Sequence, residues 1–182
     1  MSNALENFVL LKLKDGPVII ELLPSLAPNH VERFKELVSE NFYNGLSFHR
    51  VIKGFIAQTG SPNGLGTDGS GYIIPDEISG AHHDRGVLSM ANAGPNTDDS
   101  QFFITFTDCP WLDTRHTIFG RVASGMEYVD LINNGGTHSG WPPYGYGAPD
   151  KILSMSIIAK EDIPLLYSSD IVPVEIEYLG NI

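Results

Sequence analysis

Apolar and polar residues alternate along much of this chain, in short runs that glycine and proline separate. The first two runs, residues 8–14 and 18–23, are joined by Asp15-Gly16-Pro17, a sequence typical of a turn. Alternation with a period of two is the pattern of a strand that buries one face. The chain is therefore predicted to begin with a β-hairpin.

The run from residue 101 to residue 106 separates its two faces most clearly. One face is apolar and consists of Phe102, Ile104 and Phe106. The other face carries an amide and an aromatic ring, from Gln101 and Phe103. We interpret the first face as core and the second as a mixed face.

Helical spacing occurs in only two stretches. Residues 28–38 have apolar side chains three and four positions apart, and Pro28 suits the first turn of a helix. A second helix is predicted at residues 126–132, where Ser124 and Glu127 have the spacing of a capping box. Many short strands with two helices predict an all-β protein whose antiparallel sheet closes on itself, with the helices over its ends.

The length and charge of the chain limit its organisation and partners. Its 182 residues, without an internal repeat, predict one domain. There are 11 basic and 22 acidic side chains, which give a formal net charge of −11. Such a surface repels phosphate backbones and anionic lipids, so we expect neither nucleic acid nor membrane as a partner. No segment approaches the roughly 18 apolar residues of a membrane span.

Cysteine usage and the N-terminus bear on the compartment. Cys109 is the only cysteine, which excludes an internal disulfide and fits a reducing or an oxidising compartment. Residues 1–7 lack the basic start and apolar run of a secretory signal. We expect a cytoplasmic monomer, with the periplasm as the alternative if a targeting segment had been removed.

The stretch from Phe48 to Gln58 gathers an arginine, an aromatic ring and an amide in strand-like sequence. Ile56 and Gln58 share a face of this strand, and Ala57 lies opposite. No carboxylate pair, thiol or set of metal ligands accompanies Arg50 in this stretch. The pattern favours a site that grips a neutral peptide and acts on its conformation, without a metal or a cofactor.

Two motifs that could bind phosphate or metal are incomplete. The glycine-rich residues 64–71 look like a phosphate loop, but no Gly-Lys-Ser/Thr follows, so we expect a loop beside the groove. His82-His83-Asp84 suggests a metal site, but further ligands at helical or hairpin spacing are missing. We interpret these three residues as the polar part of an exposed loop.

Longer motifs carry a resemblance to a known family. They are Phe48-His49-Arg50-Val51-Ile52 with Phe55 and Gln58, Ser89 to Thr97, Ser100-Gln101-Phe102-Phe103-Ile104, and Trp111-Leu112-Asp113 to His116 with Phe119-Gly120. In this order they resemble the cyclophilin family of peptidyl-prolyl cis-trans isomerases, over about residues 7–160. The short connection at residues 41–45 is similar to that of compact, bacterial-type members.

The resemblance implies an eight-stranded antiparallel β-barrel capped by two α-helices, with a catalytic arginine at Arg50 and a peptide-binding groove. The residues that match the groove are Phe55, Ile56, Gln58, Gly66, Ala91, Asn92, Ala93, Gln101, Phe103, Trp111, Leu112 and His116. The partners implied are proline-containing peptides and unfolded protein clients. The family also implies binding of the cyclic peptide cyclosporin, to which the residue matching Trp111 donates its indole N–H.

An arginine suits the implied reaction, which is rotation about an X-Pro peptide bond. Amide resonance sets a barrier of about 18–20 kcal/mol. When that resonance is lost in the twisted state, the proline nitrogen becomes pyramidal and can accept a hydrogen bond from a guanidinium. We expect an isomerase that assists protein folding, and the alternative is a proline-motif binding module with little turnover.

Some positions depart from the family pattern. Ile56 stands where methionine is usual, and its β-branched side chain is stiffer. Asp68 and Asp99 stand where many relatives have glycine, near the rim of the groove. We hypothesise that these two acids favour substrates with basic residues beside the proline.

The C-terminal residues lie outside the resemblance. We assign residues 1–160 to the isomerase domain and residues 161–182 to an acidic tail. Alternation at Val174, Ile176 and Tyr178 predicts that the tail packs on the domain as an arm or edge strand, with disorder as the alternative. The loop at residues 133–150 is rich in glycine, proline and aromatic residues, and we interpret it as a packed surface loop or a flap near the groove.

Overall fold

The fold is known from a computed structural model, which describes residues 6–137 and 147–168. The aromatic residues Trp141, Tyr144 and Tyr146 lie outside this range, and so do residues 169–182 with the predicted edge strand. The predictions for these segments therefore stay predictions.

The described residues form one antiparallel sheet of nine strands. The strands are β1 Phe8–Lys12, β2 Pro17–Leu22, β3 Arg50–Ile52, β4 Ile56–Thr59, β5 Val87–Met90, β6 Phe102–Thr105, β7 Ile118–Ser124, β8 Gly135–Gly136 and β9 Ser154–Ile158. The predicted hairpin is confirmed, because β1 and β2 pair from Phe8 opposite Glu21 to Lys12 opposite Pro17.

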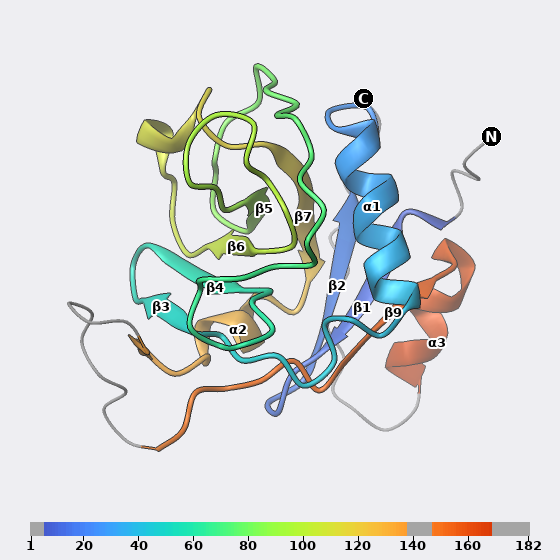
Figure 1. Cartoon of the computed structure of the whole chain (residues 1–182). Coiled ribbons are helices and arrows are strands. Elements are labelled where there is room, and N and C mark those ends of the chain that lie inside the picture. The colour runs from blue at the N-terminus through green and yellow to red at the C-terminus, as the bar shows by residue number, and fades with distance from the viewer. Residues whose placement is uncertain (1–5, 138–146, 169–182) are drawn as a thin grey trace.

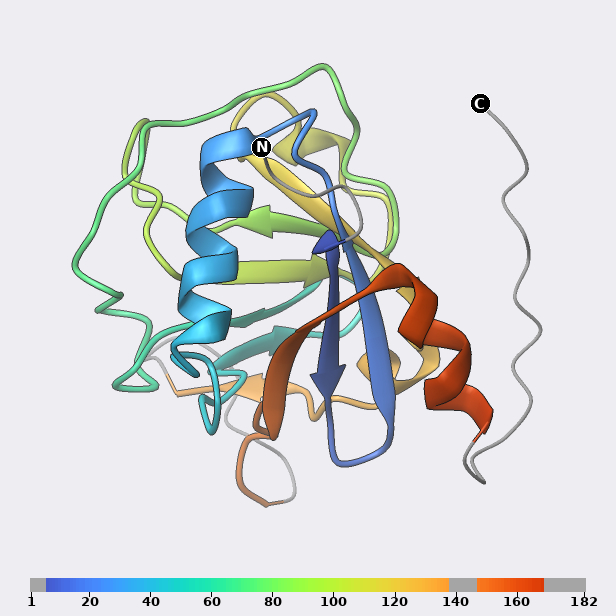
Figure 2. The ribbon, with the colours of Figure 1, turned by 90° about the vertical axis from the view of Figure 1, so that its right-hand side faces the viewer.

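The sheet wraps around a core, as the predicted barrel requires. Its hydrogen-bonded order is β8-β3-β4-β6-β5-β7-β2-β1-β9, and Figures 1 and 2 show β3 to β6 crossing the direction of β1, β2 and β9. The predicted barrel is thus the observed architecture, with β8, a short pair of glycines that pairs with β3, as a ninth strand. Among the described residues no strand pairing joins β8 to β9.

Two helices contribute to the core. Helix α1, Pro28–Ser39, confirms the first predicted helix and packs against β9 and β7, while α2, Met126–Asp130, contacts β2. Phe34 of α1 lies in an aromatic group, with its ring centroid 5.2 Å from that of Tyr43, 5.4 Å from that of Phe102 and 4.9 Å from that of Phe119. Tilted and edge-to-face contacts of this kind stabilise the fold by about 0.5–1.5 kcal/mol each beyond area burial.

The start of α2 differs from the predicted capping box. Its N-cap is Gly125 rather than Ser124, and no side chain caps the helix. Gly125 has φ of 87°, and a Cβ at this position would lie 2.3 Å from the carbonyl oxygen of Pro17. A tight, left-handed entry to the helix therefore takes the place of a serine cap, because only glycine fits beside β2 here.

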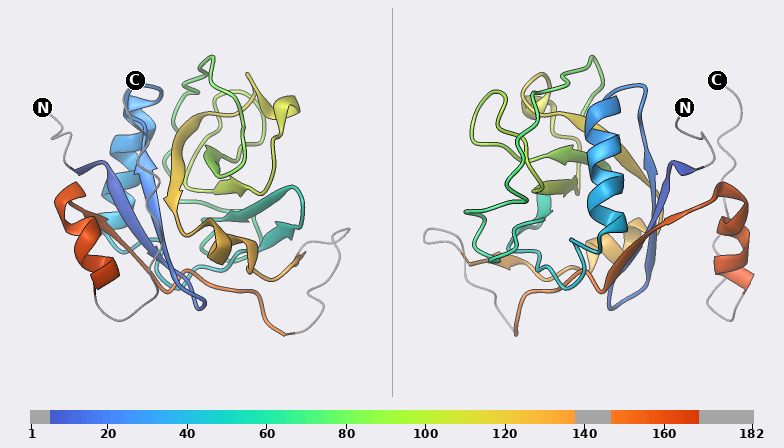
Figure 3. Two further views of the ribbon diagram at one scale, coloured as in Figure 1. Left: turned by 180° about the vertical axis from the view of Figure 1, so that it is seen from behind. Right: turned by 45° about the vertical axis from the view of Figure 1, so that its right-hand side comes forward.

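The first part of the acidic tail is helical. After β9 the chain forms a 3-10 turn, η3 Lys160–Asp162, and then a third helix, α3 Ile163–Ser168. Figure 3 shows α3 on the outside of the barrel, next to the edge that β9 forms. In the described residues, no helix is long and apolar enough to cross a membrane.

A buried histidine near the beginning of α1 connects this helix to two loops through its ring nitrogens. His30 Nδ1 lies 2.6 Å from Glu77 Oε2, and His30 Nε2 lies 3.0 Å from Asp98 Oδ2. Burial lowers the pKa of His30, but the hydrogen bonds and charges of Asp98 and Glu77 outweigh burial and raise that pKa overall. An imidazolium between two carboxylates thus connects the helix to the loops that precede β5 and β6.

Candidate functional site

Four neighbouring strands place one residue each in a row across the sheet. Arg50 of β3 pairs with Gln58 of β4, Gln58 pairs with Phe103 of β6, and Phe103 pairs with Ser89 of β5. Residues directly opposite each other share a face of the sheet. The adjacent row points the other way and lies in the core, with Val51, Ala57, Ile104 and Leu88. The alternation that was predicted for β4 and β6 is therefore confirmed.

A pocket of about 250 Å³ opens on the outward face of this row. Its lining residues, all of them predicted from the sequence, are Arg50, Phe55, Ile56, Gln58, Ala91, Asn92, Phe103, Leu112 and His116. The pocket combines apolar side chains, among them Phe55 and Phe103, with the Arg50 guanidinium and two side-chain amides. Such a site suits a small apolar ring that is attached to a polar backbone.

Arg50 is held in place by a series of side-chain amides. Its Nη1 donates to Gln58 Oε1 at 3.0 Å, Gln58 Nε2 donates to Gln101 Oε1 at 3.0 Å, and Gln101 Nε2 donates to the carbonyl oxygen of Asp68 at 2.7 Å. Burial lowers the pKa of Arg50, but a guanidinium stays protonated at neutral pH. The arrangement offers a positioned permanent charge at the pocket wall.

A second pocket of about 460 Å³ continues the first one. Gln58, Ala91 and Asn92 line both pockets, and the second adds the predicted residues Gly66, Ala93 and Gln101. The glycine-rich loop at residues 64–71 therefore borders the groove, as the sequence suggested. The two pockets share three lining residues and therefore form one groove.

The two acids on the groove rim stabilise this loop. Asp68 accepts hydrogen bonds from Ser61 Oγ at 2.6 Å and from the backbone N–H of Asn63 at 3.0 Å. Asp99 accepts from the backbone N–H groups of Ser70 at 2.8 Å and Gly71 at 3.0 Å. Both acids also line the second pocket, so they fix the loop and leave their negative charge at the groove.

The far wall of the first pocket comes from the segment after β6. Leu112 belongs to a 3-10 turn, η2 Pro110–Leu112, and the exposed ring of Trp111 lies 5.8 Å from that of Phe55. His116 Nδ1 lies 2.8 Å from the carbonyl oxygen of Met90, which can only accept, so this nitrogen carries a proton. Trp111 is the one predicted residue that lines neither pocket.

Two histidines near the site are buried. His49 is buried, 1% exposed, and does not form part of the groove surface. His83, predicted to lie in an exposed polar loop, is also 1% exposed and contacts Asp113 and Ser89. His82 beside it is exposed, as expected. Nothing in the local sequence indicated the burial of His83, because its partner Asp113 is 30 positions away.

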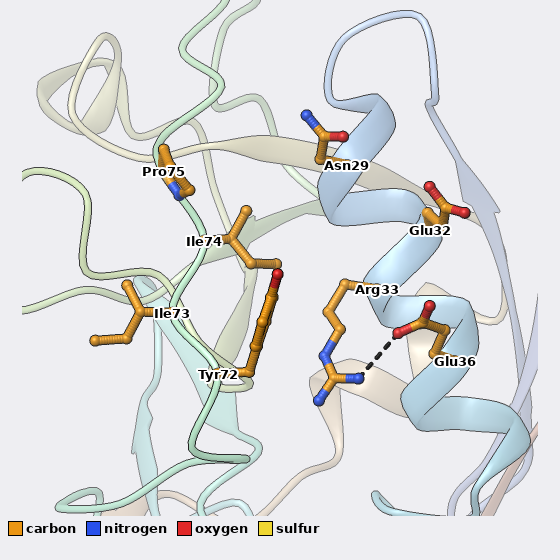
Figure 4. Close-up of a pocket in the computed structure, with 8 residues that line it drawn as sticks. All are labelled: Asn29, Glu32, Arg33, Glu36, Tyr72, Ile73, Ile74 and Pro75. Atoms are coloured by element: carbon orange, nitrogen blue, oxygen red, sulfur yellow. Dashed lines mark hydrogen bonds and ion pairs between the residues drawn. The ribbon is translucent and has the colours of Figure 1, made fainter.

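A separate hollow of about 360 Å³ lies between α1 and residues 72–75 (Figure 4). Arg33 crosses it, with its guanidinium 5.3 Å from the Tyr72 ring and 2.9 Å from Glu36 Oε2. Ile73 points away from the helix in this view and also lines the second pocket of the groove. The Arg33 charge in this hollow is paired with Glu36, and the apolar side of the hollow comes from residues 72–75.

In the part of the chain that the structure describes, no group of three or more His, Cys, Asp or Glu side chains is arranged to hold a metal ion. Cys109 is fully buried and donates to the carbonyl oxygen of Thr107 at 3.3 Å. Burial raises the pKa of its thiol, and so do the charges of Asp108 and Asp113.

Comparison with known proteins identifies relatives along most of the chain. Residues 8–156 match the family model described as cyclophilin type peptidyl-prolyl cis-trans isomerase/CLD. The chain is 45% identical over 167 residues to a probable peptidyl-prolyl cis-trans isomerase of Brucella suis, a match that covers 85% of this chain and 84% of that protein.

Solved structures have the same fold. A cyclophilin-type isomerase of Cryptosporidium parvum has a TM-score of 0.75 at 32% identity, over 85% of this chain and 98% of that one. A crystal structure of that type, obtained in the presence of the dipeptide Ala-Pro, has a TM-score of 0.73 at 31% identity, over 84% of this chain and 99% of that one. The row of residues, the groove and these matches agree, and the chain belongs to the cyclophilin family of peptidyl-prolyl cis-trans isomerases.

Proposed function

We propose that this isomerase binds an X-Pro segment with the proline ring in the 250 Å³ pocket and that Arg50 stabilises the twisted transition state. The observation that carries the proposal is the row across the sheet, which puts the Arg50 guanidinium on the same face as the Phe103 ring. An apolar wall that holds the ring and a charge beside it are the two parts that the reaction requires.

Charge at this position acts on the barrier rather than on binding alone. In the planar amide the proline nitrogen is conjugated and is a poor acceptor, whereas in the twisted state its lone pair is available. A guanidinium N–H that donates to this lone pair interacts with the transition state only, and such an interaction raises kcat. Each ~1.4 kcal/mol of this stabilisation is worth a factor of ten in rate.

Hydrogen-bonding groups beside the pocket hold the peptide while one side of it rotates. Gln58 and Asn92 line both pockets, so they lie where the backbone on either side of the proline would pass. The second pocket then takes the neighbouring residues of the substrate. The structure related to this chain that was obtained with Ala-Pro supports a proline-containing ligand of this kind.

Further partners follow from the same surface. We propose that a cyclosporin-type cyclic peptide competes for the groove, with the indole N–H of Trp111 as a donor, since this ring is 57% exposed next to Phe55. We also propose that the protein acts as a cytoplasmic monomer on unfolded clients. Competition in the isomerase assay and the mass in solution by light scattering test these two points.

The decisive experiment compares Arg50→Ala with the wild type on a tetrapeptide that contains Ala-Pro. A protease-coupled assay gives kcat and KM, and a direct binding measurement gives Kd. We expect kcat to fall by at least about 100-fold, corresponding to ~2.7 kcal/mol, while Kd changes by less than about threefold. Arg121→Ala is the matched control, because Arg121 is an exposed arginine paired with Glu21 outside the groove.

Two results would contradict the proposal in different ways. An Arg50→Ala variant with wild-type kcat would remove the arginine from the mechanism. A wild type that binds the peptide but does not accelerate its isomerisation would favour the alternative of a proline-motif binding module.

A further inference from the structure

A buried imidazole packs directly behind the wall of the proline pocket. The ring of His83 stacks on that of Phe103, with centroids 6.1 Å apart and planes 20° apart. It also meets the ring of His116 edge-on at 6.4 Å, and Phe103 and His116 meet at 5.5 Å. Two of these three rings line the pocket, and the third supports both of them from inside.

His83 also forms hydrogen bonds with both ends of the turn that contains Leu112. Its carbonyl oxygen accepts from the backbone N–H of Cys109 at 2.7 Å, at the start of η2. At the other end, Asp113 Oδ1 accepts from the backbone N–H of His83 and lies 2.8 Å from its Nδ1. Leu112, which lies between these two attachment points, can therefore keep its position against the pocket.

The protonation of this pair is fixed by its surroundings. The hydrogen bonds of His82 and His83 lower the pKa of Asp113 to about 2, so the carboxylate is ionised and can only accept. Burial lowers the pKa of His83, and this outweighs the opposing hydrogen bond and charge of Asp113. His83 Nδ1 faces this acceptor and therefore carries a proton, and Nε2 lies 2.9 Å from the Ser89 hydroxyl.

Backbone strain next to Asp113 requires such an anchor. Thr114 follows it with φ of 62°, a left-handed conformation that is unusual for a β-branched residue. Strained conformations of this kind cost on the order of 1–3 kcal/mol and persist only where surrounding contacts hold them. The contacts beside it are the hydrogen bonds of Asp113 and the backbone hydrogen bond from the N–H of Arg115 to the carbonyl oxygen of Leu112 at 3.1 Å.

We propose that His83 is a positioning residue, which acts through Asp113 to hold Leu112 and the Phe103 ring in the geometry that receives proline. The hydrogen bonds run from serine to histidine to aspartate, through Ser89, His83 and Asp113, as in a catalytic triad. Ser89 is fully buried, however, so its hydroxyl does not meet a substrate. The role of the group is to shape the pocket. This inference rests on the assignment of the proline ring to that pocket.

Loss of this support should change binding more than chemistry. The apolar wall holds the proline ring in the ground state and in the twisted state alike, so weaker contact raises KM and leaves kcat nearly unchanged. A variant that is merely less stable behaves differently. Its unfolded fraction lowers the apparent kcat, while the molecules that remain folded keep their KM.

The test uses His83→Phe, Asp113→Ala and the double variant, with His82→Ala as the matched control. Phenylalanine keeps a flat ring against Phe103, and Ser89 can still donate to the carbonyl oxygen of Thr117 at 3.0 Å. We expect His83→Phe to raise KM about fivefold, the equivalent of one lost hydrogen bond, with kcat within about twofold of the wild type. His82, which is exposed and bonds the same carboxylate, should leave KM within about twofold when it is replaced by alanine.

Asp113→Ala should raise KM at least as much, and the double variant should match Asp113→Ala alone, because both changes remove the same hydrogen bond. Multiplicative effects in the double variant, or an unchanged KM in His83→Phe or Asp113→Ala, would overturn the proposal. If His83→Phe does not fold, Asp113→Ala against His82→Ala decides the question.

A pocket-wall variant separates this inference from the assignment of the pocket. Phe103→Ala must raise KM if proline binds there. If it does so and the His83 and Asp113 variants do not, the positioning role alone is wrong. If Phe103→Ala also leaves KM unchanged, the pocket assignment itself is wrong.

Discussion

Arg50 and Gln58 face each other across the β3–β4 hairpin, and Arg50 Nη1 donates to Gln58 Oε1 at 3.0 Å. Gln58 is in turn oriented by Gln101, which is anchored on the backbone of Asp68. The guanidinium of Arg50 therefore has a defined direction before any peptide binds. An arginine has about 2 kcal/mol of rotamer entropy to lose, and part of this loss occurs in the free enzyme.

The first prediction concerns this amide series. Gln58→Leu should lower kcat/KM about tenfold, because it removes a charge-assisted hydrogen bond to Arg50. Gln101→Leu leaves Gln58 in contact with Arg50, so its effect should be smaller, about threefold. The isomerase assay on both variants checks the order of the effects. Equal kcat/KM values for the wild type and Gln58→Leu would show that Arg50 needs no such support.

A second prediction follows from the charge on His30. Because contacts with Asp98 and Glu77 raise the pKa of His30, the folded protein binds more protons than the unfolded chain just above pH 6.5. The free energy of unfolding should then fall as pH rises through the raised pKa, and the full stabilisation is present below about pH 6.5. Urea unfolding between pH 5.5 and about 8.5 measures this slope.

The variant His30→Gln should lose this slope and be less stable by about 3 kcal/mol at pH 6, since Asp98 stays buried without its partner charge. His82→Ala is the control. The pKa of His82 is also raised by its hydrogen bond to Asp113, but this group is exposed, so the slope should persist in the control. A slope that survives in His30→Gln would assign the pH dependence to another group.

A third prediction concerns the left-handed residue after Asp113. Thr114→Gly removes the clash of a β-branched side chain at φ of 62° and should raise the free energy of unfolding by about 1 kcal/mol. Asn41→Gly is the matched control, because asparagine tolerates its φ of 58° and should gain only a few tenths of a kcal/mol. Equal changes in the two variants would mean that Thr114 is not strained.

A fourth prediction tests the acids of the groove. Their hydrogen bonds to Ser61, Ser70 and the adjacent loop fix Asp68 and Asp99 at the second pocket. Peptides with lysine beside the proline should therefore have kcat/KM about threefold above those with glutamate at low salt. The ratio should approach one near 1 M salt, where charges are screened within roughly 3 Å. A ratio of one at low salt would contradict the hypothesis.

The sequence determined the parts of the site that depend on strand alternation. The alternation predicted Gln58 and Phe103 on the groove face. A register shift of one residue would turn them toward the core and expose their apolar neighbours Ala57 and Ile104. The first helix was equally clear from its spacing. The pattern that predicts such an element lies within the element's own sequence, and the contacts in the fold are consistent with it.

Features that depend on distant contacts did not follow from the sequence. His83 is polar, lies in a loop and has an exposed histidine beside it, so only its partner 30 residues away explains its burial. At α2, the close approach of β2 selects Gly125 over a serine cap. No pattern indicated helix α3 at the start of the tail, where the acidic residues at 161 and 162 belong to a 3-10 turn before it.

The row that runs from Arg50 through Gln58 and Phe103 to Ser89 has a consequence for how this protein can change. Its first three members reach the groove only because two strand pairings keep each one level with the next. One residue inserted into β4 would turn the amide inward and a small apolar side chain outward, which would empty the site while leaving its composition intact. Insertions and deletions in a functioning relative must therefore fall in the connections, such as residues 60–86, and substrate preference can vary there without any change in the reacting centre.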